Sequence, residues 1–166
     1  MADENKAANQ ADVARVWRLI EKIEICMFAS RDGDAIRARP MRAIPREAEN
    51  TVYLLTDTEG HKESEIAANN HVSLIFAEPA HGKFLTVTGT ARVLNDRTLI
   101  ADLWNTDAEA FWESADDPRV RAVEVTPLDD QFWEGPHGIV ATVQMAIAAA
   151  TALPPVIGEQ RKVDLQ

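Results

Sequence analysis

Short runs of β-forming residues, separated by turn-like segments, constrain the fold of this chain more than any other feature of its sequence. The run "TVYLLT" is rich in β-branched and aromatic residues, and "RDGD" lies between two such runs as a turn that can close a hairpin. The predicted strands cover residues 23–30, 35–44, 51–56, 71–78, 83–96 and 119–128, and "DDQFWEGP" continues the last of them. Because they follow one another at hairpin distances, we expect an antiparallel barrel or sandwich of six strands, not a parallel doubly wound sheet.

Two residues inside these runs indicate irregular strand geometry. Pro40 cannot donate a ladder hydrogen bond, so it is expected on an edge strand or at a bulge. Gly89, in the middle of the longest run, predicts a bend or a bulge.

Helical periodicity appears in the segments that flank these strands. Apolar residues recur at spacings of three and four over residues 10–24, and Asp96 is a plausible N-cap for a helix over residues 96–112. A short helix is expected over residues 61–69 and an alanine-rich one over residues 138–153, followed by a polar tail. We therefore expect a mainly β fold with flanking helices, organised as a single domain over residues 1–166 with a frayed start at 1–9 and a C-terminal helix and tail at 138–166.

The charge balance limits the classes of partner. With 27 acidic against 17 basic residues, the chain has a formal net charge of −10, which argues against binding to nucleic acid or an anionic membrane. The single cysteine, Cys26, allows no intrachain disulfide, so a cytoplasmic location is expected. No apolar run approaches the roughly 18 residues of a membrane helix, and the polar N-terminus does not read as an export signal.

Three arginines stand out against this acidic background. Arg37 and Arg39 share one face of their strand, because side chains alternate along a strand, and Arg42 falls on the opposite face. Two adjacent guanidinium groups repel unless an anion lies between them, and phosphate or carboxylate matches their donor geometry. The alternative, that the arginines pair with surface acids, is equally open from the sequence.

The stretch "LLTDTEGHKESEI" passes from a strand into a helix. Backbone N–H groups at the start of that helix, with Lys62 in its first turn and His61 and Thr56 nearby, predict an anion site. The alternative is that Lys62 pairs with Glu59 or Glu65 on the surface. Since both polar stretches lie at the ends of consecutive strands, their side chains can converge on one ligand of the size and charge of a nucleotide.

Other chemistry is not indicated. The four histidines are too scattered for a metal motif, and the chain lacks HExxH, CxxC, a P-loop and GxGxxG. Cys26 is predicted to be an unreactive core thiol, and no serine has the context of a nucleophile. We therefore assign no metal ligand and no catalytic residue.

Together, several segments resemble the pyridoxamine 5′-phosphate oxidase-like FMN-binding split barrels, and in particular their general stress protein subfamily. The resemblance is carried by the order of "RARPM", "LLTD", "HK", "VSLIFA" and "VTGTARV", followed by "LW", "DDPRV", "VTPLDDQFWEGP" and "GEQRKVDL". It extends from about residue 15 to the end of the chain. It implies a six-stranded antiparallel split β-barrel.

The resemblance also implies FMN as cofactor, bound in a groove between the two subunits of a homodimer. Phe84 stands where the oxidases carry a glutamine from the partner chain, and Trp112 is expected to cover the flavin ring from the other subunit. For Trp104, simple packing of an amphipathic helix is the favoured interpretation. The cofactor-binding residues that the resemblance implies are Arg39, Pro40, Met41, Arg42, Leu55, Thr56, Asp57, His61, Lys62, Phe84 and Trp112.

Departures from the oxidases shape the expected function. Ile44 replaces a lysine of those enzymes, and the acidic "WNTDAEAFWESADD" replaces their substrate-phosphate-binding segment. Because acids repel a phosphorylated substrate, we do not expect efficient oxidation of pyridoxamine phosphate. The expected function is an FMN-dependent oxidoreductase of the general stress type that uses NADH or NADPH and a small acceptor. Two alternatives are a non-catalytic flavin-binding or flavin-storing protein, and a split barrel that has lost FMN or holds haem or a deazaflavin.

Overall fold

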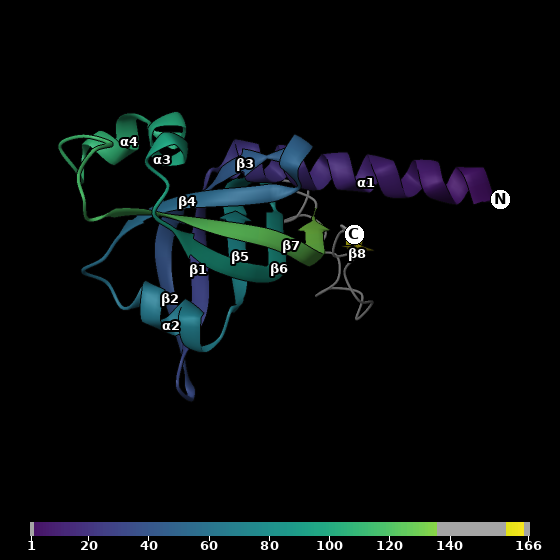
Figure 1. Ribbon diagram of the computed structural model, residues 1–166. Helices are drawn as coiled ribbons and strands as arrows, with labels where there is room; N and C mark the ends of the chain where they lie inside the picture. The colour runs from purple at the N-terminus through teal and green to yellow at the C-terminus, as the bar shows by residue number, and fades with distance from the viewer. Residues whose placement is uncertain (1, 136–158, 165–166) are drawn as a thin grey trace.

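A computed structural model describes residues 2–135 and 159–164 of the chain, with side chains described over residues 10–135. Figure 1 shows a strongly curved antiparallel sheet with helices at its ends. The strands are β1 Ile25–Asp32, β2 Ala35–Arg42, β3 Ile44–Arg46, β4 Thr51–Asp57, β5 His71–Glu78, β6 Lys83–Leu94, β7 Val120–Glu134 and β8 Glu159–Asp164. The mainly β, antiparallel prediction is confirmed, whereas the predicted helix over 138–153 lies outside the described residues.

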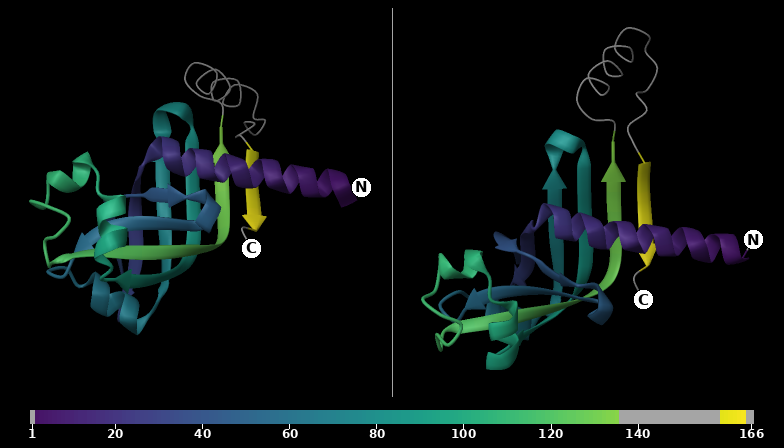
Figure 2. Two further views of the ribbon diagram at one scale, coloured as in Figure 1. Left: turned by 45° about the horizontal axis from the view of Figure 1, so that its top comes forward. Right: turned by 90° about the horizontal axis from the view of Figure 1, so that it is seen from above.

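The strands that the structure describes form one sheet in the order β2-β1-β5-β6-β7-β4-β3, and β8 pairs with β7 beside this path. All of the pairings are antiparallel. The predicted six-stranded barrel is therefore wrong in strand number and in closure: seven strands lie along the path, β8 is additional, and the sheet is not closed. β8 forms where the sequence indicated only a polar tail (Figure 2).

The reason that the sheet stays open lies at Ala43. The predicted strand over 35–44 is divided there: β2 pairs with β1 up to Arg42, and β3 pairs with β4 from Ile44 onward. Between them, the Ala43 N–H donates to the carbonyl of Glu24 at 2.7 Å, so it leaves the sheet ladder. The two ends of the sheet are thus consecutive in the chain, and among the described strands β2 has a paired neighbour on one side only. As predicted, Pro40 lies on this edge strand.

The predicted irregularity at Gly89 is confirmed. The β6–β7 register shifts between Thr88, which pairs with Asp129, and Gly89, which pairs with Pro127. A Cβ on Gly89 would lie 2.4 Å from the carbonyl oxygen of Thr126, so only glycine fits this close approach of two backbones.

The helices are α1 Ala2–Ile23, α2 Lys62–Ala68, α3 Arg97–Leu103 and α4 Thr106–Glu109, with short 3-10 turns η1 Glu47–Glu49 and η2 Pro79–His81. α1 begins at Ala2 rather than near residue 10, and its N-terminus extends past β8 (Figure 2). Asp96 caps α3 as predicted, its carboxylate accepting from the Leu99 N–H at 3.1 Å. The single helix predicted over 96–112 is wrong, because the Asn105 side chain caps a new helix by accepting from Asp107 N–H and Ala108 N–H.

The main core lies inside the curved sheet. Phe28, Phe76 and Phe132 are fully buried there, and α1 covers it with Val16, Trp17 and Ile20, the apolar stripe read from the sequence. A second cluster lies under α3, around Ile100 and Leu103. Burial raises the pKa of Cys26 to about 12, which agrees with an unreactive core thiol.

Candidate functional site

A cavity of about 500 Å³ opens along the free edge of β2. Its other walls are the end of β4, the first residue of α2, and the segment 105–112 that contains α4. Its volume falls within the range of ligand pockets, roughly 300–1,000 Å³. Because an edge strand has unpaired backbone N–H and C=O groups on its outer side, this wall offers main-chain as well as side-chain partners.

The structure brings together nine of the eleven residues implied by the resemblance. The cavity is lined by Arg39, Pro40, Met41, Arg42, Leu55, Thr56, Asp57, Lys62 and Trp112. The convergence of the arginine stretch with the strand-to-helix turn is therefore correct. His61 and Phe84 lie elsewhere: His61 is exposed just before α2, and Phe84 is 42% exposed on β6.

Arg39 is held by a buried carboxylate. Its Nη1 and Nη2 donate to Oε2 and Oε1 of Glu65 at 2.9 and 2.5 Å, and Ser30 Oγ donates to Oε2 of Glu65 at 2.6 Å. Burial by itself raises the pKa of Glu65, but the hydrogen bonds from Arg39 and Ser30 and the charge of Arg39 outweigh burial and hold the pKa below its usual value. The anion beside this arginine is thus an internal side chain.

Arg37 and Arg42 are also paired with acids. Arg37 Nε donates to Asp32 at 3.1 Å, on the exposed β1–β2 hairpin and outside the cavity. Arg42 Nη2 donates to Glu24 at 2.8 Å, and Nη1 forms an ion pair with Asp107. Arg42 therefore links β2, the end of α1 and α4 at one side of the cavity.

Lys62 differs from these arginines. No carboxylate oxygen among the described residues lies within 4.0 Å of its Nζ atom. Burial lowers the pKa of Lys62, attraction to Asp57 opposes this, Arg39 lowers it further, and Glu65 opposes it. An anion bound beside the ammonium would reverse this shift, so Lys62 is the cavity's available cation. The surface pairing of Lys62 with Glu59 or Glu65, left open by the sequence, is not formed.

Thr56, which lines the same cavity, carries a buried polar atom without a partner among the described residues. Its side chain is 4% exposed, and its Oγ1 has no hydrogen-bond partner in the described part of the chain. A buried hydroxyl without a partner costs about 1–3 kcal/mol, so such atoms are uncommon in folded proteins. This one points to a ligand that supplies the missing partner.

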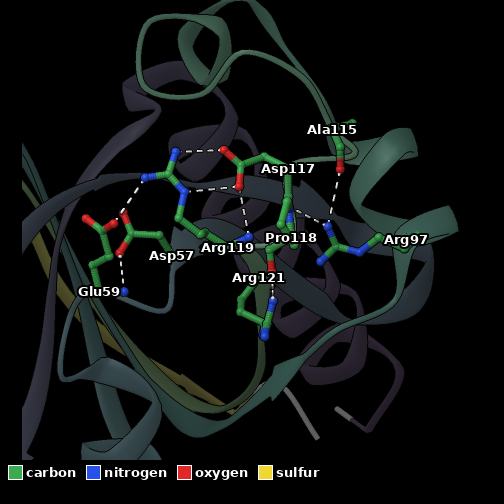
Figure 3. A network of polar contacts seen from close by, with 8 residues as sticks. All are labelled: Asp57, Glu59, Arg97, Ala115, Asp117, Pro118, Arg119 and Arg121. Atoms are coloured by element: carbon green, nitrogen blue, oxygen red, sulfur yellow. Dashed lines mark hydrogen bonds and ion pairs between the residues drawn. The ribbon is translucent and has the colours of Figure 1, made fainter.

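The turn between β4 and α2 is held from both sides (Figure 3). Asp57 Oδ1 accepts from the N–H groups of Glu59 and Gly60 at 3.1 and 3.2 Å, so these two N–H groups of the turn already have an acceptor. From the turn just before β7, Arg119 Nη1 donates to Glu59 at 3.0 Å and Nη2 donates to Asp117 at 2.8 Å. The network fixes the turn from which Lys62 extends.

Aromatic rings form the wall opposite β2. The ring of Trp112 lies 5.8 Å from that of Phe111 and 6.4 Å from that of Trp104, measured between centroids. Trp112 and Phe111 line the cavity of their own chain, and Trp104 and Trp112 both pack against the second core cluster. The packing interpretation of Trp104 is thus supported, and Trp112 needs no partner subunit to reach the site.

The sequence model of a protein family, pyridoxamine 5′-phosphate oxidase like, matches residues 11–154. The chain belongs to this family. The resemblance stated from the motif order, including its general stress protein branch, is confirmed.

Proteins similar to this family member include general stress proteins. General stress protein 26 of Bacillus subtilis is 29% identical over 82 residues, 48% of this chain and 59% of the relative, so the match spans less than two thirds of that protein. A general stress protein 26 structure from Jannaschia sp. CCS1 has a TM-score of 0.71 at 22% identity, covering 93% of this chain and 98% of that one. The general stress FMN/FAD binding protein of Xanthomonas citri has a TM-score of 0.66 at 20% identity, covering 75% and 89%.

Several site residues of this family member were missed by the sequence reading. Besides Glu65, they are Ile25, Asn105, Asp107, Ala108, Ala110 and Phe111. The Asn105 cap was a readable signal, since asparagine followed by "TDAE" is typical of a helix start. The Glu65 contact had no local signal, because its partner lies 26 residues away.

The described residues form neither a metal-ligating cluster nor a membrane-spanning helix. No group of three or more possible metal-ligating side chains occurs among them. None of the helices they form is long and apolar enough to cross a membrane.

Proposed function

We propose that this chain binds FMN in the cavity along β2 and acts as an FMN-dependent oxidoreductase. The observation that carries the proposal is the pair formed by Lys62, a half-buried cation without an acid within ion-pair distance in the described structure, and Thr56, a buried hydroxyl without a partner. Both line one cavity. A phosphate group offers the negative charge that Lys62 lacks and the acceptor oxygens that the Thr56 hydroxyl lacks. The flavin-binding neighbour from Xanthomonas citri shares the fold and supports this choice of ligand.

The remaining lining residues fit a flat, partly apolar ring system. Pro40, Met41 and Leu55 present apolar surface from two strands, and Trp112 presents an aromatic ring from the opposite wall. Such walls exclude water and orient a planar ligand. The edge of β2 adds main-chain groups that suit the polar rim of the ring.

FMN, when bound, supplies the transfer of a hydride or of single electrons, and the protein supplies position and electrostatics. NADH or NADPH is the proposed reductant, and a small molecule is the acceptor. We assign no residue as proton donor. Ile44 and Asp107 line the cavity, and Asp107 already pairs with Arg42, so neither of these two residues offers a cation to a phosphorylated substrate. Pyridoxamine phosphate is therefore a poor substrate in this proposal.

A homodimer belongs to the proposal. The outward face of the sheet carries Met27, Ile75 and Phe84, all more than a third exposed. Met27 pairs with Ile75, and Ala77 with Phe84, so these side chains share one face. Apolar side chains at adjacent positions on a sheet face favour contact with a second copy. Phe84 would then act at the partner's site, as the resemblance implies. Light scattering tests this, and a monomer would contradict it.

The first experiment is the absorption spectrum of the purified protein, before and after acid release of its ligand. We expect a flavin spectrum and about one FMN per chain. Anaerobic mixing with NADH or NADPH then tests the enzyme proposal, and we expect the bound flavin to be reduced faster than free FMN. Binding without faster reduction would leave the flavin-storing alternative, and a protein that neither contains nor takes up FMN would end the proposal.

A further inference from the structure

The cations of the cavity differ in how far their charge is already balanced. Arg39 makes two hydrogen bonds to Glu65, and Arg42 contacts both Glu24 and Asp107. Among the described residues, Lys62 has no acid within ion-pair distance. Three positive groups line the pocket, yet among the described residues only Lys62 lacks an acid in ion-pair contact, and Asp57 attracts it from farther away.

Glu65 determines this arrangement from outside the cavity. It lies one helical turn after Lys62 on α2 and is 4% exposed, so solvent screens its contact with Arg39 less than it screens a surface pair. The two parallel N–H···O contacts and the hydrogen bond from Ser30 fix its orientation. These contacts hold α2 against β1 and β2, and thereby fix the position of the Lys62 backbone at the start of α2.

We propose that Glu65 is the charge-setting and positioning residue of this site: it holds Arg39 as a neutral pair and thereby leaves Lys62 to receive the anionic group of the ligand. The identity of that ligand as FMN rests on the proposed function, whereas the division of charge among Arg39, Glu65 and Lys62 does not. Glu65 touches neither the cavity surface nor a ligand, so it acts through Arg39.

The proposal predicts that removing the charge of Glu65 compensates for the loss of Lys62. In Lys62→Ala, FMN affinity should fall about tenfold or more, since a charge-assisted hydrogen bond to the phosphate is lost. In Lys62→Ala with Glu65→Gln, Arg39 becomes an unbalanced cation at the same cavity, and we expect about tenfold of the affinity to return. Riboflavin, which lacks the phosphate, should bind all of these variants with similar affinity. FMN and riboflavin dissociation constants are measured by fluorescence quenching.

Glu63→Gln is the matched control, because it makes the same charge change on the exposed face of the same helix. Added to Lys62→Ala, Glu63→Gln should raise FMN affinity less than threefold above that of Lys62→Ala alone. If Glu65→Gln restores no more than this control while the double variant melts like Lys62→Ala, Glu65 is only structural and the proposal is wrong.

A second variant avoids leaving a buried charge unpaired. Replacing both partners, Arg39→Gln with Glu65→Gln, removes a positive and a negative charge together and keeps hydrogen-bonding groups at both positions. Since the net charge of the pair is unchanged, FMN affinity should stay within about threefold of wild type. A loss as large as that of Lys62→Ala would mean that the ligand uses the charge of Arg39, and would overturn the proposal.

A ligand-free measurement separates this proposal from the proposed function. The pH dependence of Lys62 modification by an amine-reactive reagent, followed by mass spectrometry of its peptide, reports the pKa of Lys62. Asp57, Arg39 and Glu65 are the charged groups that act on it. Glu65→Gln should lower this pKa, because the Arg39 charge becomes unbalanced, and the paired variant should return it close to wild type. This result in a protein that binds no FMN would support the role proposed for Glu65 and reject the proposed FMN function. An unchanged pKa of Lys62 in Glu65→Gln would reject the role proposed for Glu65.

Discussion

Arg119 Nη1 lies 3.0 Å from Glu59 Oε1, joining the turn just before β7 to the turn that follows β4 (Figure 3). The same guanidinium makes two contacts with Asp117, at 3.1 and 2.8 Å. A backbone hydrogen bond from Thr58 N–H to the Arg119 carbonyl, 3.0 Å long, lies beside them. The turn that precedes Lys62 is therefore fixed by contacts from a residue 60 positions away from Glu59 in the chain.

Arg119→Gln should loosen this turn without changing the sheet. The glutamine removes the contacts with Glu59 and Asp117 but keeps the backbone carbonyl that accepts from Thr58. We expect faster amide hydrogen exchange over residues 58–60 and unchanged exchange in β4. Arg92→Gln, which removes an exposed pair with Glu124 on β6 and β7, is the control. Equal effects of both variants on exchange in the turn would show that the contacts of Arg119 do not hold it.

Asp117 should make stability depend on pH in the acid range. The hydrogen bonds and charge of Arg119 lower its pKa from 3.8 to about 2. A folded-state pKa below the unfolded one contributes stability above pH 3.8 that is lost as the pH falls towards 2. The melting temperature of Asp117→Asn should thus lie below wild type at pH 6, and the gap should narrow between pH 4 and pH 2. Asp116→Asn, at the exposed neighbouring acid, should show no such narrowing.

Thr56→Val should stabilise the ligand-free protein and weaken ligand binding. Valine keeps the shape of threonine and removes the buried hydroxyl that lacks a partner. We expect a gain of up to about 1 kcal/mol in the free energy of unfolding, measured with urea, because the desolvation cost disappears. FMN affinity should fall by about tenfold, because the hydroxyl no longer meets the ligand. A loss of stability in the ligand-free protein would show that the hydroxyl already has a partner.

Gly89→Ala should destabilise the fold. Its Cβ would lie 2.4 Å from the Thr126 carbonyl, which is backbone of a paired strand and can move only with the sheet. We expect a loss of about 1–3 kcal/mol in unfolding free energy, the usual cost of overpacking. Gly60→Ala is the contrasting variant, since its Cβ would meet the flexible end of Lys62 at 2.9 Å. It should leave stability nearly unchanged and weaken FMN binding by moving the ammonium group.

Local patterns predicted the elements whose signal lies within a few residues. The strand over 51–56, the Asp96 cap and the irregularity at Gly89 were all readable, because each depends on neighbouring residues or on a glycine's missing side chain. The prediction of one helix over 96–112 was wrong because the apolar spacing continues past Asn105. Asn105 caps a new helix, and apolar periodicity carries no information about caps. β8 failed because its polar sequence is a strand only through pairing with β7.

The sequence by itself determined that this chain folds into an antiparallel, mainly β structure and which family it belongs to. It also determined that residues of two polar stretches line one cavity. Alternation and turn residues specify strands and their hairpins, and strand ends place the side chains that follow them. Only the tertiary structure decided where the sheet opens, at Ala43, and which charges in the cavity are balanced. The arginines look alike in the sequence, but Glu65 reaches Arg39 across 26 residues and Asp107 reaches Arg42 across 65. Such pairings depend on how distant segments pack, which no local pattern encodes.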